Sequence, residues 1–284
     1  MSDTTSPHLT RIAVHPIKSL EPVTLQTAEI AENGGLRHDR EYAMFDDDEK
    51  YVNGKRTADV HRIRTSFDDG LEHVTLRIEE ESEESACRFS LSNDWSELAD
   101  WLTEYFGYPV HLKRDSKGGF PDDTVLSGPT VISTATLREV ASWFDGLDEH
   151  QMRLRLRANL EIDGVPPFWE DRLYSDHDHE VVFRIGDVTF RGANPCQRCI
   201  VPVRDPHTGE EYPEFQRIFI ENRKRTLPEW ADRARFDHYF CLMVNTKVPE
   251  SEWKSGVAVG DELEVLGEVP MEGPINKTGS DQLG

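Results

Sequence analysis

The sequence predicts a mainly β chain of the α+β class, which forms β-barrels and carries a few helices. Many short segments alternate apolar and polar residues or are rich in β-branched and aromatic residues, and turn residues lie between them. Only a few segments show helical periodicity. Strands and helices do not alternate regularly, which argues against a doubly wound parallel sheet.

The residue pattern of the first hundred or so positions predicts five strands and one helix. The strands are expected at residues 9–14, 23–30, 41–45, 73–78 and 88–91. The helix follows them, because Asn93 is a suitable cap and Gly107 a suitable stop. Its apolar stripe consists of Trp95, Leu98, Leu102 and Tyr105. We interpret that stripe as ordinary core packing.

A polar, glycine-rich segment at residues 113–128 indicates a boundary or crossing loop. We therefore expect one β-barrel unit over residues 8–115 and a second over residues 124–267. Residues 268–284 lack periodicity and are expected to form a flexible tail.

The second unit is also predicted to consist mostly of strands. The spacing of Thr136 and Glu139 is that of a capping box, and helical periodicity continues to Gly146. Strands are expected at residues 129–133, 160–162, 181–185, 188–190, 200–203, 239–244 and 262–266.

Charge and composition argue against nucleic-acid-binding, membrane-spanning and disulfide-rich proteins. The 284 residues include 54 Asp and Glu against 32 Lys and Arg, for a formal net charge of −22. This dispersed acidity, in a chain poor in Lys, resembles proteins of salt-rich cytoplasms and argues against a nucleic-acid partner. No long apolar run or secretory signal is visible, so we expect no membrane span and a cytoplasmic location. Four cysteines argue against a disulfide framework.

The most informative motif is a pair of cysteines three residues apart, Cys196 and Cys199, with Arg198 between them. Thiolate is the ligand that soft and transition metals select, and a neighbouring guanidinium favours the thiolate form. A structural zinc site would need two more ligands, whereas Cys87 and Cys241 are isolated. A redox pair should open a helix, whereas a strand is predicted to follow. A soft-metal site beside an anion is therefore favoured.

Arginines cluster in a second segment. Arg153, Arg155 and Arg157 are spaced two apart, which on a strand would place them on one face. Guanidinium groups bind phosphate in a bidentate manner. The cluster therefore indicates either an anionic ligand or an internal acidic partner, and the spacing does not choose between them. Lys18 and Ser19, after the first strand, are a further pair suited to phosphate.

Taken in order, these segments resemble the MOSC family in its two-part form with an N-terminal β-barrel. The nearest type is similar to the mitochondrial amidoxime-reducing component and its bacterial relatives. The resemblance covers residues 8–267 and rests on the ordered occurrence of several elements. These are Pro16-Ile17-Lys18-Ser19, Asp39-Arg40-Glu41-Tyr42, residues 132–137, residues 155–160, Arg198-Cys199, Asp205-Pro206 with Thr208-Gly209, residues 236–239 and residues 259–261. Leu156 and Ala158 depart from the Phe and Pro that are usual in the family.

The resemblance implies a molybdenum cofactor, with Cys199 as the catalytic residue and the ligand of molybdenum. It assigns the pterin and its phosphate to Lys18, Ser19, Arg40, Ser133, Thr134, Arg155, Arg157, Asn159, Arg198 and Tyr239. Cys196 is expected to be a packing residue. These residue types suit the ligand, because hydroxyl and amide groups can bond pterin edges while cations bind phosphate.

The implied activity is reduction of small N-hydroxylated or N-oxide substrates. A separate protein is expected to donate the electrons, because no cysteine follows Cys241 to form an iron–sulfur set. Two alternatives stay open: a sulfur carrier or sulfurtransferase with a persulfide on Cys199, and a non-catalytic carrier of the molybdenum cofactor. The family is also associated with pyridoxal-phosphate enzymes, but no Schiff-base lysine can be nominated here.

Overall fold

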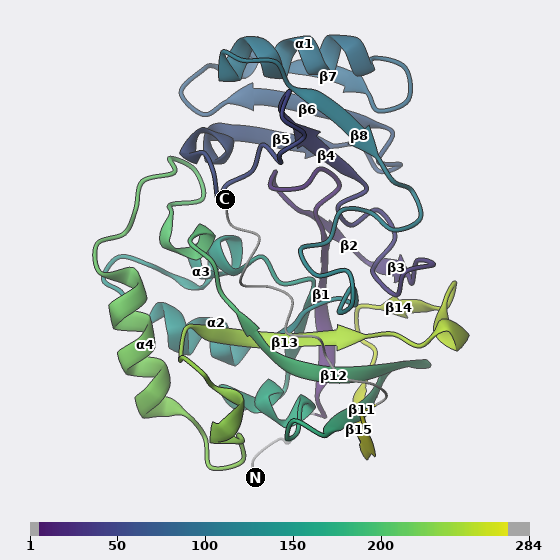
Figure 1. The fold of residues 1–284 in the computed structure, drawn as a ribbon, viewed down its shortest axis with the longest axis vertical. Coiled ribbons are helices and arrows are strands. Elements are labelled where there is room, and N and C mark those ends of the chain that lie inside the picture. The colour runs from purple at the N-terminus through teal and green to yellow at the C-terminus, as the bar shows by residue number, and fades with distance from the viewer. Residues whose placement is uncertain (1–5, 272–284) are drawn as a thin grey trace.

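The computed structural model describes residues 6–271 and confirms the mainly β prediction (Figure 1). Its largest sheet has eight strands. Their order is β15 (Leu263–Pro270), β11 (His179–Ile185), β12 (Val188–Gln197), β13 (Cys241–Lys247), β9 (Val131–Ser133), β10 (Leu160–Asp163), β1 (His8–Val14) and β2 (Val23–Leu25). Neighbouring strands are antiparallel except β9 and β10, which are parallel.

The sheet closes into a barrel where β1 meets the start of β15. His8 pairs with Glu262 in an antiparallel bridge, and the Leu263 amide donates to the carbonyl of Pro7 over 2.7 Å. Alternate residues of the strands point inward, as a period of two requires. Phe183 and Phe190 stack inside the barrel with ring centroids 5.4 Å apart.

The N-terminal part encloses a core of its own. Strand β4 (Tyr42–Phe45) pairs with β8 (His111–Arg114), and β5 (Ile63–Phe67), β6 (His73–Ile78) and β7 (Cys87–Ser90) form a second antiparallel sheet. Helix α1 (Trp95–Phe106) covers that sheet at one end of the molecule (Figure 1). Leu98 and Leu102 are buried, so the predicted stripe is confirmed as core packing.

The two predicted units share strands. Strands β1 and β2 precede the N-terminal sheets in the chain but belong to the eight-stranded sheet of the second unit. The predicted strand at 23–30 is split into β2 and β3 (Thr27–Glu29), and β3 pairs with β14 (Gly256–Ala258). The strands of the N-terminal part therefore begin only at β4, after β2 has paired with β1 and β3 with β14.

Three further helices cover the side of the barrel (Figure 1). They are α2 (Thr134–Ala141), α3 (Glu149–Leu156) and α4 (Phe215–Thr226). Short 3-10 helices are η1 (Ala58–Arg62), η2 (Glu83–Ser85), η3 (Trp169–Leu173), η4 (Val201–Val203), η5 (Arg233–Arg235) and η6 (Glu250–Glu252). Within residues 6–271, no helix combines the length and apolar character needed to cross a membrane.

Several sequence expectations are corrected. Arg153 and Arg155 lie on helix α3 and Arg157 caps its C-terminus, so the three are not on one face of a strand. Residues 201–203 form a 3-10 turn instead of a strand, because Arg155 binds the carbonyls that a strand would pair.

Several helices and strands begin or end at other residues than the sequence predicts. Helix α1 has Asp94 at its N-cap, and helix α2 begins at Thr134 after the N-cap Ser133, before the predicted capping box. Strand β15 continues to Pro270, so the start of the expected tail is ordered by pairing with β11. The rest of the expected tail, residues 272–284, lies outside the described residues. Strands β5, β8 and β14 and helices α3 and α4 were not predicted.

Candidate functional site

A cleft of about 1300 Å³ lies between the N-terminal part and the barrel. The loop after β1, the turn before β4, the end of α3 and the end of β12 all contribute to its wall. The residues that line it and were predicted as site residues are Lys18, Ser19, Arg40, Arg157, Asn159, Arg198 and Cys199. Segments far apart in the sequence therefore bring seven of the predicted positions together.

The backbone around the cleft adopts unusual conformations. Ser19, Arg40, Arg157 and Met243 line it with φ of 77°, 54°, 57° and 72°. Residues with a Cβ rarely adopt this left-handed region, and it costs free energy unless the surroundings enforce it. Such residues tend to gather at functional sites, so their concentration here supports the cleft as the candidate site.

Two of the guanidinium groups predicted for the site, Arg157 and Arg198, lack a carboxylate partner within the described residues. Arg157 donates from Nη2 to the carbonyl of Leu20 over 2.7 Å. Arg198 donates from Nη2 to the carbonyl of Leu156 over 3.0 Å, and its buried Nε has no hydrogen-bond partner. Burial, followed by repulsion from Arg40, lowers the pKa of Arg157 to about 10, so the group stays charged at neutral pH. A buried charge without a partner of opposite charge is costly, so these two guanidinium groups suit an anion.

The other two predicted cations have acidic partners. Lys18 Nζ lies 3.0 Å from Asp122 Oδ1, and Arg40 pairs with its neighbour Asp39. Burial opposes ionisation of Asp39, but Arg40 and bonds from His15 outweigh it and hold the pKa of that carboxyl well below its usual range. The amide nitrogen of His15 donates to Asp39 over 2.8 Å. Arg40 is thereby fixed in place at the cleft wall.

Both cysteines of the motif line the cleft and are partly buried. Cys196 lies near the end of β12, and Cys199 lies in the turn that follows. Arg198 contacts the first of them: its Nη1 is 3.1 Å from Cys196 Sγ. Cys241 is buried on the neighbouring strand, and burial, with Cys196 nearby, raises its pKa to about 12. Within the part of the chain that is described, no three His, Cys, Asp or Glu side chains group as metal ligands, so the zinc alternative lacks a ligand set.

Four predicted site residues do not line the cleft. The Ser133 side chain caps helix α2 by accepting from the Thr136 amide over 3.1 Å, and Thr134 donates to Glu161 over 2.8 Å. Arg155 lines a separate small pocket, and Tyr239 stacks on Phe236 with ring centroids 5.6 Å apart.

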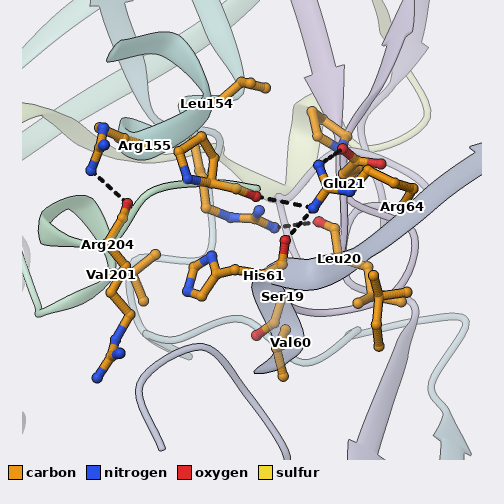
Figure 2. A pocket seen from close by; sticks show the side chains of 14 residues that line it. Ser19, Leu20, Glu21, Val60, His61, Arg64, Leu154, Arg155, Val201 and Arg204 are labelled. Carbon is orange, nitrogen blue, oxygen red and sulfur yellow. Dashed lines mark hydrogen bonds and ion pairs between the residues drawn. The ribbon is translucent and has the colours of Figure 1, made fainter. Parts of the chain in front are cut away.

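A small inner pocket of about 20 Å³ adjoins the cleft and shares Ser19, His61 and Arg157 with it (Figure 2). It has room for a water molecule but not for a cofactor. Arg155 Nη1 donates there to the carbonyl of Arg204 over 2.6 Å, and Arg64 donates to Glu21 over 2.6 Å and to the Pro206 carbonyl over 3.1 Å (Figure 2). These bonds tie the segment after Cys199 to helix α3 and to the N-terminal part.

Several polar cleft residues were not anticipated from the sequence, among them Lys55, His61 and Asp122. His61 is buried, and its Nε2 has no hydrogen-bond partner. Burial, followed by the charge of Arg157, lowers the pKa of His61 to about 4, so its ring is neutral at physiological pH. Each of the three is a single polar residue outside any motif, so only the fold could have found them.

The fold and the cleft define a two-part β protein whose cleft is lined by several cationic side chains and by two cysteines. The chain belongs to the MOSC family. The model of the MOSC N-terminal beta barrel domain matches residues 6–109, and that of the MOSC domain matches residues 129–264. The resemblance drawn from the sequence is therefore confirmed at the level of the family.

Relatives of two kinds are similar to this chain. It is 24% identical to a molybdenum cofactor sulfurase of Drosophila grimshawi over 289 residues, which cover 92% of this chain and 35% of the relative. Identity to the molybdenum cofactor sulfurase of Homo sapiens is 23%, covering 77% of this chain and 29% of the relative. Mitochondrial amidoxime-reducing component 1 of Danio rerio is 24% identical, with 71% of this chain and 70% of the relative covered. The chain thus spans about a third of the length of these sulfurases.

Proposed function

We propose that the cleft binds a molybdenum cofactor through Cys199 and that the protein reduces N-hydroxylated or N-oxide compounds. The observation that carries this proposal is the meeting of Cys199 with Arg157 and Arg198 in one cleft, where neither guanidinium has a carboxylate partner within the described residues. The donor set fits the cofactor, because a thiolate suits molybdenum and unpaired guanidiniums suit a phosphate.

The residues have distinct roles in this proposal. Arg157 and Arg198 would hold the phosphate, and Lys18 and Arg40 line the same cleft. Asn159 presents an amide side chain that is anchored by a 3.1 Å bond from its Nδ2 to the carbonyl of Ala13. Arg155 acts indirectly, by fixing the segment that follows Cys199. When bound, the cofactor would supply two-electron redox chemistry and an acceptor for the substrate oxygen.

The proposed overall reaction is a two-electron reduction of an N–O bond. The N–O bond of the substrate breaks, two electrons and two protons are consumed, and water and the reduced amine or amidine are released. The electrons would come from a separate donor protein. Similarity to the amidoxime-reducing component over 70% of that relative's length supports this function.

A second candidate is a sulfur carrier with a persulfide on Cys199. It is supported by the several relatives named molybdenum cofactor sulfurase, each matched over about a third of its length. In that case Cys199, in its turn at the cleft wall, would accept and pass on sulfur, and no metal would be held permanently. A non-catalytic carrier of the cofactor is the remaining alternative.

One preparation decides among these functions. The full chain, purified from a host that makes molybdopterin, is analysed for molybdenum, zinc, pterin fluorescence after oxidation and cyanide-releasable sulfur. It is also assayed with an amidoxime and reduced viologen as the electron donor. Molybdenum and pterin near one per chain, with turnover, support the reductase. Persulfide sulfur in a protein that does not turn over the amidoxime supports a sulfur carrier. Bound cofactor without turnover supports a non-catalytic carrier of the cofactor. Full zinc occupancy without pterin would contradict all three.

A further inference from the structure

The loop between β8 and β9 runs along the cleft and is anchored on both sides of Asp122. On one side, the Phe120 amide donates to the carbonyl of Arg40 over 2.8 Å, and the Phe120 ring packs against Phe45. On the other side, Ser127 donates its hydroxyl to the carbonyl of Asn33. Asp122 lies between these anchors and lines the cleft.

Asp122 binds two ammonium groups through one oxygen atom. Its Oδ1 lies 3.0 Å from Lys18 Nζ and 3.2 Å from Lys55 Nζ. The three residues come from separate parts of the chain, and all three line the cleft. One oxygen bridging two ammonium groups is also an arrangement that a phosphate oxygen can adopt, because lysine binds phosphate as a point charge.

The two sides of this contact differ in their exposure to solvent. Lys18 is 6% exposed, its Nζ donates to the Phe120 carbonyl over 2.7 Å, and it lies 4.8 Å from the centroid of the Tyr51 ring. The side chain of Asp122 is 57% exposed. The Lys18 ammonium is therefore held by its surroundings, whereas the Asp122 carboxylate stands half in solvent and can give up its contact with Lys18 and Lys55 when another anion takes its place.

We propose that Asp122 is a built-in competitor for anions at the Lys18–Lys55 pair and so sets how tightly the cleft holds a phosphate group. The inference rests on the anion-binding part of the proposed function. An anionic ligand would exchange with the Asp122 carboxylate and release the middle of the loop. The apparent affinity is then lower than the intrinsic one by the fraction of molecules in which Asp122 is undocked.

Asp123 provides a matched control. It also lines the cleft and carries the same charge, but its Oδ1 accepts from the amides of Val125 and Leu126, over 2.8 and 2.9 Å. An asparagine at 123 retains that acceptor while removing the charge. Asp122→Asn and Asp123→Asn therefore change the net charge equally, and only the first removes the competitor.

The test is calorimetric titration of the full chain with inorganic phosphate and with pyrophosphate, using protein from a host that cannot make molybdopterin. Asp122→Asn is expected to bind phosphate about tenfold more tightly than the wild type, which corresponds to Asp122 being docked in about nine-tenths of the wild-type molecules. The affinity of Asp123→Asn for phosphate is expected to stay within about twofold of the wild-type affinity. Unchanged or weaker binding by Asp122→Asn would mean that Asp122 positions Lys18, and would overturn the proposal. Equal gains in both variants would reduce the effect to net charge and would also overturn it.

Hydrogen exchange gives a second readout that needs no variant. Phosphate should speed exchange of the Asp122 and Asp123 amides in the wild type, because the loop centre is released, and slowed or unchanged exchange would contradict the competition. These results separate the two hypotheses. If the protein never acquires molybdenum but Asp122→Asn still gains phosphate affinity, only the proposed function is contradicted. If the protein acquires molybdenum but Asp122→Asn gains no phosphate affinity, only this inference is contradicted.

Discussion

The guanidinium of Arg198 lies against Cys196, with Nη1 3.1 Å from the sulfur, and makes no hydrogen bond to Cys199 within the described residues. From the sequence, Arg198 was expected to favour the thiolate of Cys199 and Cys196 to be a packing residue. The structure instead gives Arg198 two bonds that fix Cys196 relative to the Leu156 carbonyl at the end of α3. The two cysteines therefore differ: Cys196 has the guanidinium bond and Cys199 does not.

The first prediction concerns these two thiols. Cys199→Ser should lose molybdenum and amidoxime reduction, because a serine hydroxyl is a harder ligand that ionises far less readily than a thiol. Cys196→Ser should retain activity within roughly tenfold of the wild type, since a hydroxyl can still accept from Arg198 at a net cost of about 1 kcal/mol. Metal content and turnover are measured in both variants. Reductase activity that survives Cys199→Ser unchanged would refute the assignment of Cys199.

The second prediction concerns Arg157. Arg157→Met should reduce affinity for the cofactor by about two to three orders of magnitude, as truncating one partner of a buried charge pair costs roughly 2–5 kcal/mol. Arg153→Met is the control, because Arg153 binds Glu161 over 2.6 Å and does not line the cleft. The control should lower stability without changing pterin content per folded chain. Equal pterin content in the two variants would show that Arg157 does not bind the ligand.

The strands were largely predictable, whereas helices α3 and α4 were not, and a buried arginine explains both failures. On α3 the buried face consists of Met152, Arg155 and Leu156, so a charged residue occupies one helical position. On α4, Arg223 follows Phe215 and Phe219 on the buried face. In each helix the arginine occupies a position where an apolar residue is expected, so the sequence lacks the continuous apolar stripe by which an amphipathic helix is predicted. Only the fold reveals the carbonyls and carboxylate that accept from them.

The site was predictable only in part for a related reason. Lys18, Arg157 and Cys199 stand in segments whose order resembles a family, so the sequence brought them together. Lys55 and Asp122 belong to no motif, and they meet only through a loop contact between residues 67 positions apart. Ser133 and Arg155 have residue types that suit a phosphate, yet the structure uses them to cap a helix and to hold a turn. Residue type alone could not distinguish these uses.

The third prediction concerns the buried ion pair between Arg223 and Asp171. Arg223 is fully buried, its Nη2 donates to both carboxylate oxygens over 2.8 and 2.6 Å, and it lies over the ring of Phe168. Arg223→Met should lower the free energy of unfolding by roughly 3–5 kcal/mol, because it leaves Asp171 as an unpaired buried charge.

Urea denaturation measures this loss. Arg217→Met is the control, since Arg217 forms exposed pairs on the same helix that contribute roughly 0–1 kcal/mol. A loss below about 1 kcal/mol in Arg223→Met would show that the pair does not stabilise helix α4 against the barrel.

The last prediction concerns a buried carboxyl beside that pair. Glu170 is buried and accepts from the Thr136 hydroxyl over 3.0 Å. Burial, followed by the charge of Asp171, raises the pKa of Glu170 from 4.5 to about 7. Between these two values the folded protein binds a proton that the unfolded chain has released. The contribution of Glu170 to the free energy of unfolding is therefore complete below pH 4.5 and is lost as the pH rises towards 7.

The whole loss is about 3–4 kcal/mol, because the pKa rises from 4.5 to about 7 and each unit of pKa shift corresponds to about 1.4 kcal/mol. Glu170→Gln cannot ionise, so relative to the wild type it should gain most of this amount, about 2–3 kcal/mol, between pH 5 and pH 8. His15 and His61, whose pKa values burial lowers to about 3 and about 4, act in the opposite direction, but they are present in both proteins and cancel in the difference. Urea titrations at several pH values measure that difference, with the exposed Glu84→Gln as the control. A difference that stays flat from pH 5 to pH 8 would show that Glu170 ionises as readily in the folded protein as in the unfolded chain.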